Sequence, residues 1–136
     1  MDKISTVCII DDDPIFIYGT KRIMKNIGFD GEIIVYNNGQ DAMDGLVEIA
    51  KENGKLPSLI LLDLNMPIMN GLEFLEEYRK IPVDQKNGVV LYVISSSVDP
   101  IDCEKVKSFD DVKNYILKPF TPDDLNQIMS QRTSKL

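Results

Sequence analysis

Short apolar runs alternate with longer amphipathic runs along most of this chain. The apolar runs are rich in β-branched and aliphatic residues and are bounded by polar residues, glycine or proline, which is typical of strands. They cover residues 6–10, 32–36, 58–63, 88–95 and 113–117. The run 58–63 has four consecutive aliphatic residues at 59–62, which indicates a strand buried on both faces of a sheet.

Between these runs, apolar residues recur at the spacing of an amphipathic helix. In chain order they are Phe16, Ile23 and Ile27; Ala42, Leu46, Ile49 and Ala50; Phe74, Tyr78 and Ile81; and Leu125, Ile128 and Met129. Gly28 is expected to end the first helix, and the Asn-Gly-Lys sequence at 53–55 the second. Residues 99–107 open with Asp-Pro but carry a weak apolar stripe, so they predict a short, marginal helix.

Two helix starts have clear capping signals. Asp13 precedes Pro14, so the aspartate is expected to cap the first helix with proline at its first position. Thr121 precedes Pro122 in the same way, and Asp124 completes a pair resembling a capping box.

Five strands that alternate with helices predict an α/β fold of five βα units. Crossover connections between parallel strands are right-handed and place helices on both faces of the sheet, so a doubly wound parallel sheet is expected. The length of 136 residues fits a single domain over 1–136, with a core at about 4–130 and no output domain.

Composition and charge limit the possible functions. With 43% hydrophobic and 27% charged residues, the sequence is that of an ordinary globular protein. It has neither an apolar run of roughly 18 residues nor the pattern of a secretory signal at its start, so a cytoplasmic location is expected. A net charge of −7 with scattered Lys and Arg argues against nucleic acid or an anionic membrane as a partner.

The cysteines do not indicate a disulfide framework or a metal site. Cys8 falls in an expected strand and Cys103 in an expected helix, where both fit as small apolar residues. The chain contains no histidine, which excludes a site built from cysteine and histidine ligands.

Polar side chains gather where four of the expected strands end. Asp11–Asp13 follow the first strand, Asp63 the third, Ser95–Ser97 the fourth and Lys118 the fifth. Each feature alone also fits a solvated turn, a loop or a surface lysine. In open α/β sheets, however, ligands bind outside the carboxyl ends of the strands, so their joint arrival at one edge favours a functional site.

The residue types at this edge predict phosphoryl transfer. Converging carboxylates form an oxygen-only site that suits Mg²⁺, and the cation would offset their mutual repulsion. A carboxylate such as Asp63 can also act as a nucleophile and form an aspartyl phosphate. Lys118 would supply a second positive charge and Ser95 a hydroxyl donor to the phosphoryl oxygens.

At this point the sequence resembles the receiver domains of two-component response regulators. The resemblance rests on "IIDDDP", "LLDLNMPIMNG", "VISSS" and "YILKPF", which occur in the family's order. It covers about residues 4–130 and implies a flavodoxin-like fold with strand order 2-1-3-4-5.

The resemblance also implies roles for the acidic residues and for Asn65. Asp63 would accept the phosphoryl group. Asp11 and Asp12 would hold Mg²⁺ together with Asp63 and the backbone carbonyl of Asn65, with Asp12 as the more direct ligand. Asp13 would serve mainly as the helix cap.

Further roles follow from the same resemblance. Ser95 would be the switch hydroxyl, and Lys118 would pair with the phosphoryl oxygens and precede a cis peptide bond to Pro119. Tyr115 stands where the family has a rotating aromatic side chain, although an ordinary edge-strand tyrosine would also fit. Ser97 and Asn65 occupy positions that tune the dephosphorylation rate.

The function implied is that of a stand-alone response regulator. A histidine kinase or histidine phosphotransfer protein would donate the phosphoryl group, and a downstream protein would bind the face formed by residues 99–107, the fifth strand and the last helix. The chain would catalyse only its own phosphorylation and autodephosphorylation and is not expected to be an enzyme otherwise. Two alternatives remain: a phosphorylation-independent adaptor, and an aspartyl-phosphate phosphohydrolase, which would normally have a second carboxylate where Asn65 stands.

Overall fold

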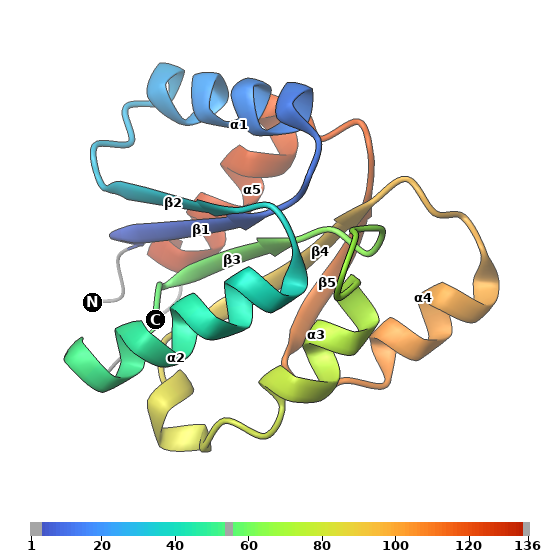
Figure 1. Ribbon diagram of the computed structural model, residues 1–136. Helices are drawn as coiled ribbons and strands as arrows, with labels where there is room; N and C mark the ends of the chain where they lie inside the picture. The colour runs from blue at the N-terminus through green and yellow to red at the C-terminus, as the bar shows by residue number, and fades with distance from the viewer. Residues whose placement is uncertain (1–3, 54–55, 135–136) are drawn as a thin grey trace.

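Five parallel strands form a single sheet in the order β2-β1-β3-β4-β5 (Figure 1). The computed structural model describes residues 4–53 and 56–134. The strands are β1 (Thr6–Ile10), β2 (Glu32–Tyr36), β3 (Leu59–Leu62), β4 (Val90–Ser95) and β5 (Val112–Leu117). The five-stranded doubly wound fold expected from the sequence is therefore confirmed, including its strand order.

Helices cover both faces of this sheet. They are α1 (Pro14–Asn26), α2 (Gly39–Asn53), α3 (Gly71–Tyr78), α4 (Pro100–Lys107) and α5 (Pro122–Ser134). α1 and α5 lie on one face, and α2, α3 and α4 on the other (Figure 1). Each side of the sheet has its own cluster of buried apolar side chains, and the strand β3 is fully buried between them.

Several element boundaries differ from those expected. β3 is shorter at both ends than 58–63, and β4 begins at Val90 because Gly88 turns the chain with a φ of +79°. α3 ends at Tyr78, so Ile81 lies in the turn after the helix, where its N–H donates to the Tyr78 carbonyl. A 3₁₀ turn, η1 (Val83–Lys86), was not expected. The Asn-Gly-Lys sequence at 53–55, which was expected to end the second helix, falls largely outside the described residues.

The capping signals at the starts of α1 and α5 are confirmed. The Asp13 carboxylate accepts the N–H of Ile15, 3.0 Å away. At α5 the two bonds of a capping box form, because the Thr121 N–H donates to Asp124 and the Asp124 N–H donates to the Thr121 hydroxyl. The fully buried residues of α1 are Thr20 and Met24, which were not among the apolar positions that predicted the helix.

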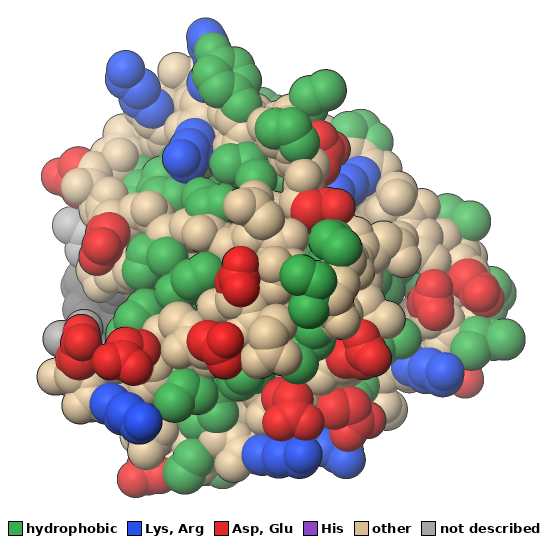
Figure 2. Space-filling view, viewed as in Figure 1, with side chains coloured by type: hydrophobic (Ala, Val, Ile, Leu, Met, Phe, Trp, Pro, Cys, Tyr) green, Lys and Arg blue, Asp and Glu red, His purple; other side chains and the backbone are tan. Residues whose placement is uncertain are grey.

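Both cysteines are free thiols. Cys8 is buried in the sheet and Cys103 is half-buried on α4. Within residues 4–53 and 56–134, every helix is too short or too polar to cross a membrane. Acidic side chains are spread over much of the face seen in Figure 2, with basic ones mainly at its top and along its lower edge.

A lysine in η1 ties together the two loops at the amino end of the sheet. The Lys86 ammonium lies 3.2 Å from the Asp111 carboxylate and 3.3 Å from the Tyr78 carbonyl oxygen. It also sits 4.9 Å from the centre of the Tyr78 ring. The Lys86 side chain is 9% exposed and the Asp111 side chain 23%, so this ion pair is partly shielded from water.

Lys86→Met is expected to lower the free energy of unfolding by about 1–3 kcal/mol, because it leaves the Asp111 carboxylate without its cation and removes one of the two hydrogen bonds to the Tyr78 carbonyl, which keeps the Ile81 N–H. Lys80→Met is the matched control. Lys80 pairs with Glu77 at the surface, with 66% of its side chain exposed, and such pairs contribute at most about 1 kcal/mol. Urea denaturation measures both variants, and equal losses would contradict a structural role for the ion pair of Lys86 and Asp111.

Candidate functional site

The acidic residues meet because β1 and β3 are parallel neighbours in the middle of the sheet. The Asp63 N–H donates to the Ile10 carbonyl at 2.9 Å, and the Asp11 N–H to the Tyr36 carbonyl at 3.0 Å, so both continue the ladder past the strand ends. Oxygens of Asp11, Asp12 and Asp63 all lie within 4.8 Å of one another. Asp11 and Asp63 are buried, at 1% and 6% exposed, and Asp12 is exposed.

Close packing of α3 against the end of β3 fixes the backbone at Asp63. A Cβ atom on Gly71 would lie 2.5 Å from the Asp63 carbonyl oxygen, so glycine is required there. The Gly71 N–H donates to the Leu64 carbonyl at 2.8 Å. Asn70 and Glu73 form a capping box that starts α3 at this point.

Lys118 brings a positive charge to the carboxylates from β5. Its ammonium lies 2.9 Å from Asp11 and 3.9 Å from Asp63. Its backbone N–H donates to the Ser95 carbonyl at 2.9 Å, which anchors it to the end of β4. The peptide bond between Lys118 and Pro119 is cis, as the resemblance implied.

Two residues that the sequence did not assign to this site support it. The Phe16 ring centre lies 4.6 Å from the Lys118 ammonium, so the ring faces the cation from the first turn of α1. The Asn37 side chain donates to the Asp11 carbonyl at 3.4 Å. In the sequence, Phe16 fits the apolar stripe of its helix. The one signal that could have assigned it to this site is its position, about one turn after the acidic residues.

The positive charge of Lys118 does not offset the effects of burial and mutual repulsion on the carboxylates. Burial, and then the charge of Asp11, raise the pKa of Asp63 to about 6, while Lys118 and the Asn65 N–H act in the opposite direction. Burial also raises the pKa of Asp11 above its usual value, against the Asp13 N–H and Lys118. Further positive charge at this position would stabilise the ionised carboxylates.

These donors fit a hard divalent cation. The group offers carboxylate oxygens only, which is the ligand type that Mg²⁺ prefers. Asp12 is exposed, so the cluster is open to solvent on one side, and Mg²⁺ usually keeps several water ligands in proteins. The acidic cluster can therefore hold a metal ion.

Ser95 lies at the end of β4, the strand next to β3, and is linked to Tyr115 through Ser97. Ser95 is fully buried at the end of β4, and its hydroxyl oxygen accepts the Ser97 N–H at 3.2 Å. The half-buried Tyr115, on the edge strand β5, donates its hydroxyl to the Ser97 carbonyl at 2.8 Å. Burial raises the pKa of Tyr115, so its hydroxyl remains protonated at neutral pH.

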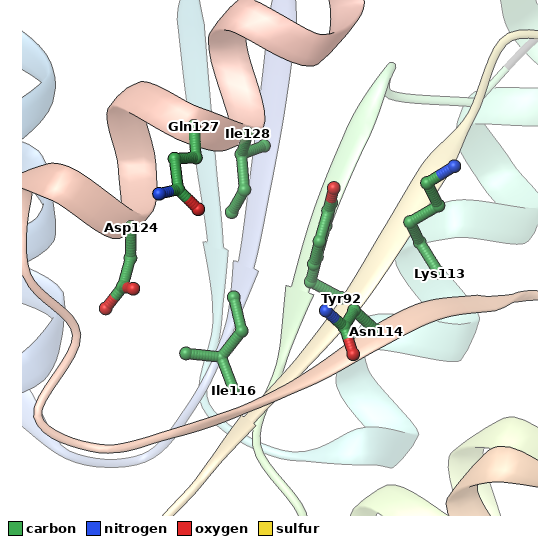
Figure 3. A pocket seen from close by; sticks show the side chains of 7 residues that line it. All are labelled: Tyr92, Lys113, Asn114, Ile116, Asp124, Gln127 and Ile128. Carbon is green, nitrogen blue, oxygen red and sulfur yellow. The ribbon is translucent and has the colours of Figure 1, made fainter.

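Two pockets of the described residues have none of the three clustered aspartates in their walls. One of about 410 Å³ lies between α1 and the loop after β5, and Asp13, Phe16 and Lys118 are part of its wall. Another of about 220 Å³ lies between α5 and the strands β4 and β5 (Figure 3). It is lined by Tyr92, Lys113, Asn114, Ile116, Asp124, Gln127 and Ile128, so it includes none of the site residues expected from the sequence.

Comparisons with solved structures return the same fold. A two-component response regulator from Cytophaga hutchinsonii is 32% identical, with a TM-score of 0.85 over 98% of this chain and 99% of that one. The phosphorylated cyanobacterial phytochrome response regulator RcpA is 26% identical, with a TM-score of 0.78 over 96% of this chain and 94% of that one.

Sequence comparisons agree with the structural ones. The nitrate/nitrite response regulator protein NarL of Escherichia coli is 32% identical over 127 residues, which are 93% of this chain and 54% of NarL. The chain thus spans about half the length of this relative. The family model of the response regulator receiver domain matches residues 7–130. This protein therefore belongs to the response regulator receiver domain family.

Proposed function

We propose that this receiver accepts a phosphoryl group on Asp63 in a Mg²⁺-dependent reaction. The observation that carries the proposal is the position of the Lys118 ammonium, which faces Asp11 at 2.9 Å and Asp63 at 3.9 Å in an otherwise acidic cluster. A buried carboxylate beside a fixed cation can attack phosphorus while the charge on the phosphoryl oxygens is compensated.

In the transfer, an Asp63 oxygen attacks the phosphorus atom of a phosphohistidine on the donor protein. The bond from phosphorus to the donor nitrogen breaks, the imidazole leaves, and a mixed anhydride forms on Asp63. Lys118 faces the oxygens of the transferred group from β5. Mg²⁺, held by Asp11, Asp12, Asp63 and the Asn65 carbonyl, would supply the remaining neutralising charge.

The histidine belongs to the partner, because this chain has none. A histidine kinase or a histidine phosphotransfer protein is therefore the donor that we propose. The chain would catalyse only its own phosphorylation and dephosphorylation. A phosphohydrolase is disfavoured, because Asn65 stands where that chemistry would need a second carboxylate.

The output is proposed to be a shift between two packings of α4, β5 and α5. Phosphorylation would draw the Ser95 hydroxyl toward Asp63, and Tyr115 would move with the loop that follows β4. A downstream protein would then bind this face with altered affinity. The stand-alone arrangement and the cytoplasmic location stay predictions, and NarL extends well beyond the matched region.

The proposal is tested by incubating the protein with a small phosphodonor and Mg²⁺. Phosphate-affinity electrophoresis should show a retarded band that is stable in acid and lost in base, as expected for an acyl phosphate. Chelation of the metal should suppress the band. The same unshifted band with and without the donor and metal would overturn the proposal.

Asp12→Ala is expected to weaken Mg²⁺ binding by at least about tenfold, because it removes one of the carboxylates that converge at the site. Asp13→Ala is the matched control, since the Asp13 side chain is used to cap α1. It should change Mg²⁺ affinity much less and mainly lower stability. Isothermal titration calorimetry measures both affinities, and equal losses would show that the acidic residues are assigned wrongly.

A further inference from the structure

Ser97 is the centre of the hydrogen bonds in the β4–α4 loop. Its N–H donates to the Ser95 hydroxyl oxygen at 3.2 Å, and its carbonyl accepts the Tyr115 hydroxyl at 2.8 Å. Its own hydroxyl donates to the Asp102 carboxylate at 2.8 Å. Both proposed switch residues thus bond to one loop residue, and the hydroxyl of that residue bonds to Asp102.

Asp102 ties this loop to α4. It lies half-buried in the first turn of the helix, five residues beyond Ser97. Val106 is the one fully buried residue among Pro100–Lys107, so apolar packing holds this helix weakly. The exposed side chains of Val98 and Ile101 beside it are 75% and 63% accessible. The contact between Asp102 and Ser97 therefore helps to set where the start of α4 lies, together with the N–H of the N-cap residue Asp99, which donates to the Ser97 hydroxyl at 3.4 Å.

We propose that Asp102 is a positioning residue for the Ser95–Tyr115 switch, and that it holds the loop in the unphosphorylated arrangement through the Ser97 hydroxyl. This inference rests on the proposed function of Asp63. In the observed arrangement the Ser95 oxygen is occupied by the Ser97 N–H. Ser95 must give up that bond, or carry the loop with it, to reach a phosphoryl group.

The energetic argument concerns the difference between the two arrangements. A hydroxyl bonded to an ionised carboxylate makes a stronger hydrogen bond than a neutral pair does. If that bond forms in one arrangement and breaks in the other, it shifts their populations by its net free energy. Its loss should raise the population that is ready to accept phosphate, and with it the rate of phosphorylation.

Asp102 has a second effect that the experiment must separate. A negative charge in the first turn also stabilises α4 through the helix dipole. Ser97→Ala removes the same hydrogen bond and leaves that charge in place, and it also removes the acceptor of the Asp99 N–H, 3.4 Å away. Ser97→Thr keeps the hydroxyl and should restore wild-type behaviour. Glu104→Ala, at an exposed position of the same helix, removes a charge without touching the loop.

The test measures the rate of phosphorylation by a small phosphodonor with Mg²⁺, together with the amide NMR signals of Ser97 and Tyr115. Asp102→Ala and Ser97→Ala should each raise the rate about tenfold, the order expected for one charge-assisted hydrogen bond. The double variant should be no faster than either single one. Before phosphorylation, the two amide signals should already lie part of the way toward their positions in the beryllofluoride-treated wild type.

The possible failures can be told apart. If the wild type is phosphorylated but both single variants keep its rate and its amide signals, Asp102 does not position the switch, and the role of Asp63 stands. Additive effects in the double variant would likewise overturn the inference, since the two residues would then act independently. If the wild type takes up neither phosphate nor beryllofluoride, the proposed function itself is wrong.

Discussion

Asp63→Asn is expected to abolish phosphoryl uptake completely. The amide has nearly the shape of the carboxylate but lacks the charged oxygen that attacks phosphorus. The surrounding backbone should be unchanged, because the Asp63 N–H bond to Ile10 and the contact with Gly71 do not involve the side chain. Phosphate-affinity electrophoresis and the intact mass should both match the untreated protein.

Asp110→Asn provides the matched control for this experiment. It makes the same chemical change at an exposed aspartate in the turn between α4 and β5. This variant should be phosphorylated like the wild type. A retarded band that persists in Asp63→Asn would mean that another carboxylate accepts the group, with Asp12 the first candidate because it is the exposed member of the cluster.

Much of the fold could be predicted because its local and long-range signals agree. The buried run at β3 and the proline-bounded starts of α1 and α5 mark elements whose positions the structure confirms. Parallel pairing then brings the strand ends together, so Asp11, Asp63 and Lys118 could be grouped before any distance was known. The strand order itself came from the family resemblance, because the alternation of strands and helices does not determine it.

The details that were missed depend on contacts between distant residues. Phe16 has the sequence pattern of a core residue, but its ring faces Lys118, which follows β5. Thr20 is buried in α1 although it is polar, and the apolar spacing of the helix does not predict that position. Ser97 lies in a run of three serines, and nothing in the sequence distinguishes it as the residue that joins Ser95, Asp102 and Tyr115.

Asp63→Asn is also expected to raise the free energy of unfolding at neutral pH by about 2–3 kcal/mol when divalent cations are chelated. The pKa of Asp63 is about 6 in the folded protein, against an ordinary aspartate value of 3.8. The folded state therefore binds this proton more tightly than the unfolded state does. Ionisation of Asp63 then costs stability, and the amide does not ionise.

The sign of the effect fixes its pH dependence. Between about pH 4 and pH 6 the folded protein holds more protons at this position than the unfolded chain, so wild-type stability falls as pH rises through that window. Below it, Asp63 is protonated in both states, and the wild type and the variant should be equally stable. Urea denaturation in chelator at about pH 4 and about pH 7.5 measures the difference at both ends.

Added Mg²⁺ should narrow the gap at about pH 7.5, because a cation that binds only the folded wild type stabilises it by mass action. The variant, which lacks one carboxylate of the cluster, should respond less. An Asp63→Asn protein less stable than the wild type in chelator would show that Lys118 and the Asn65 N–H outweigh burial and the charge of Asp11. In that case the acidic cluster would carry no uncompensated negative charge, and the electrostatic argument for a cation site there would fail.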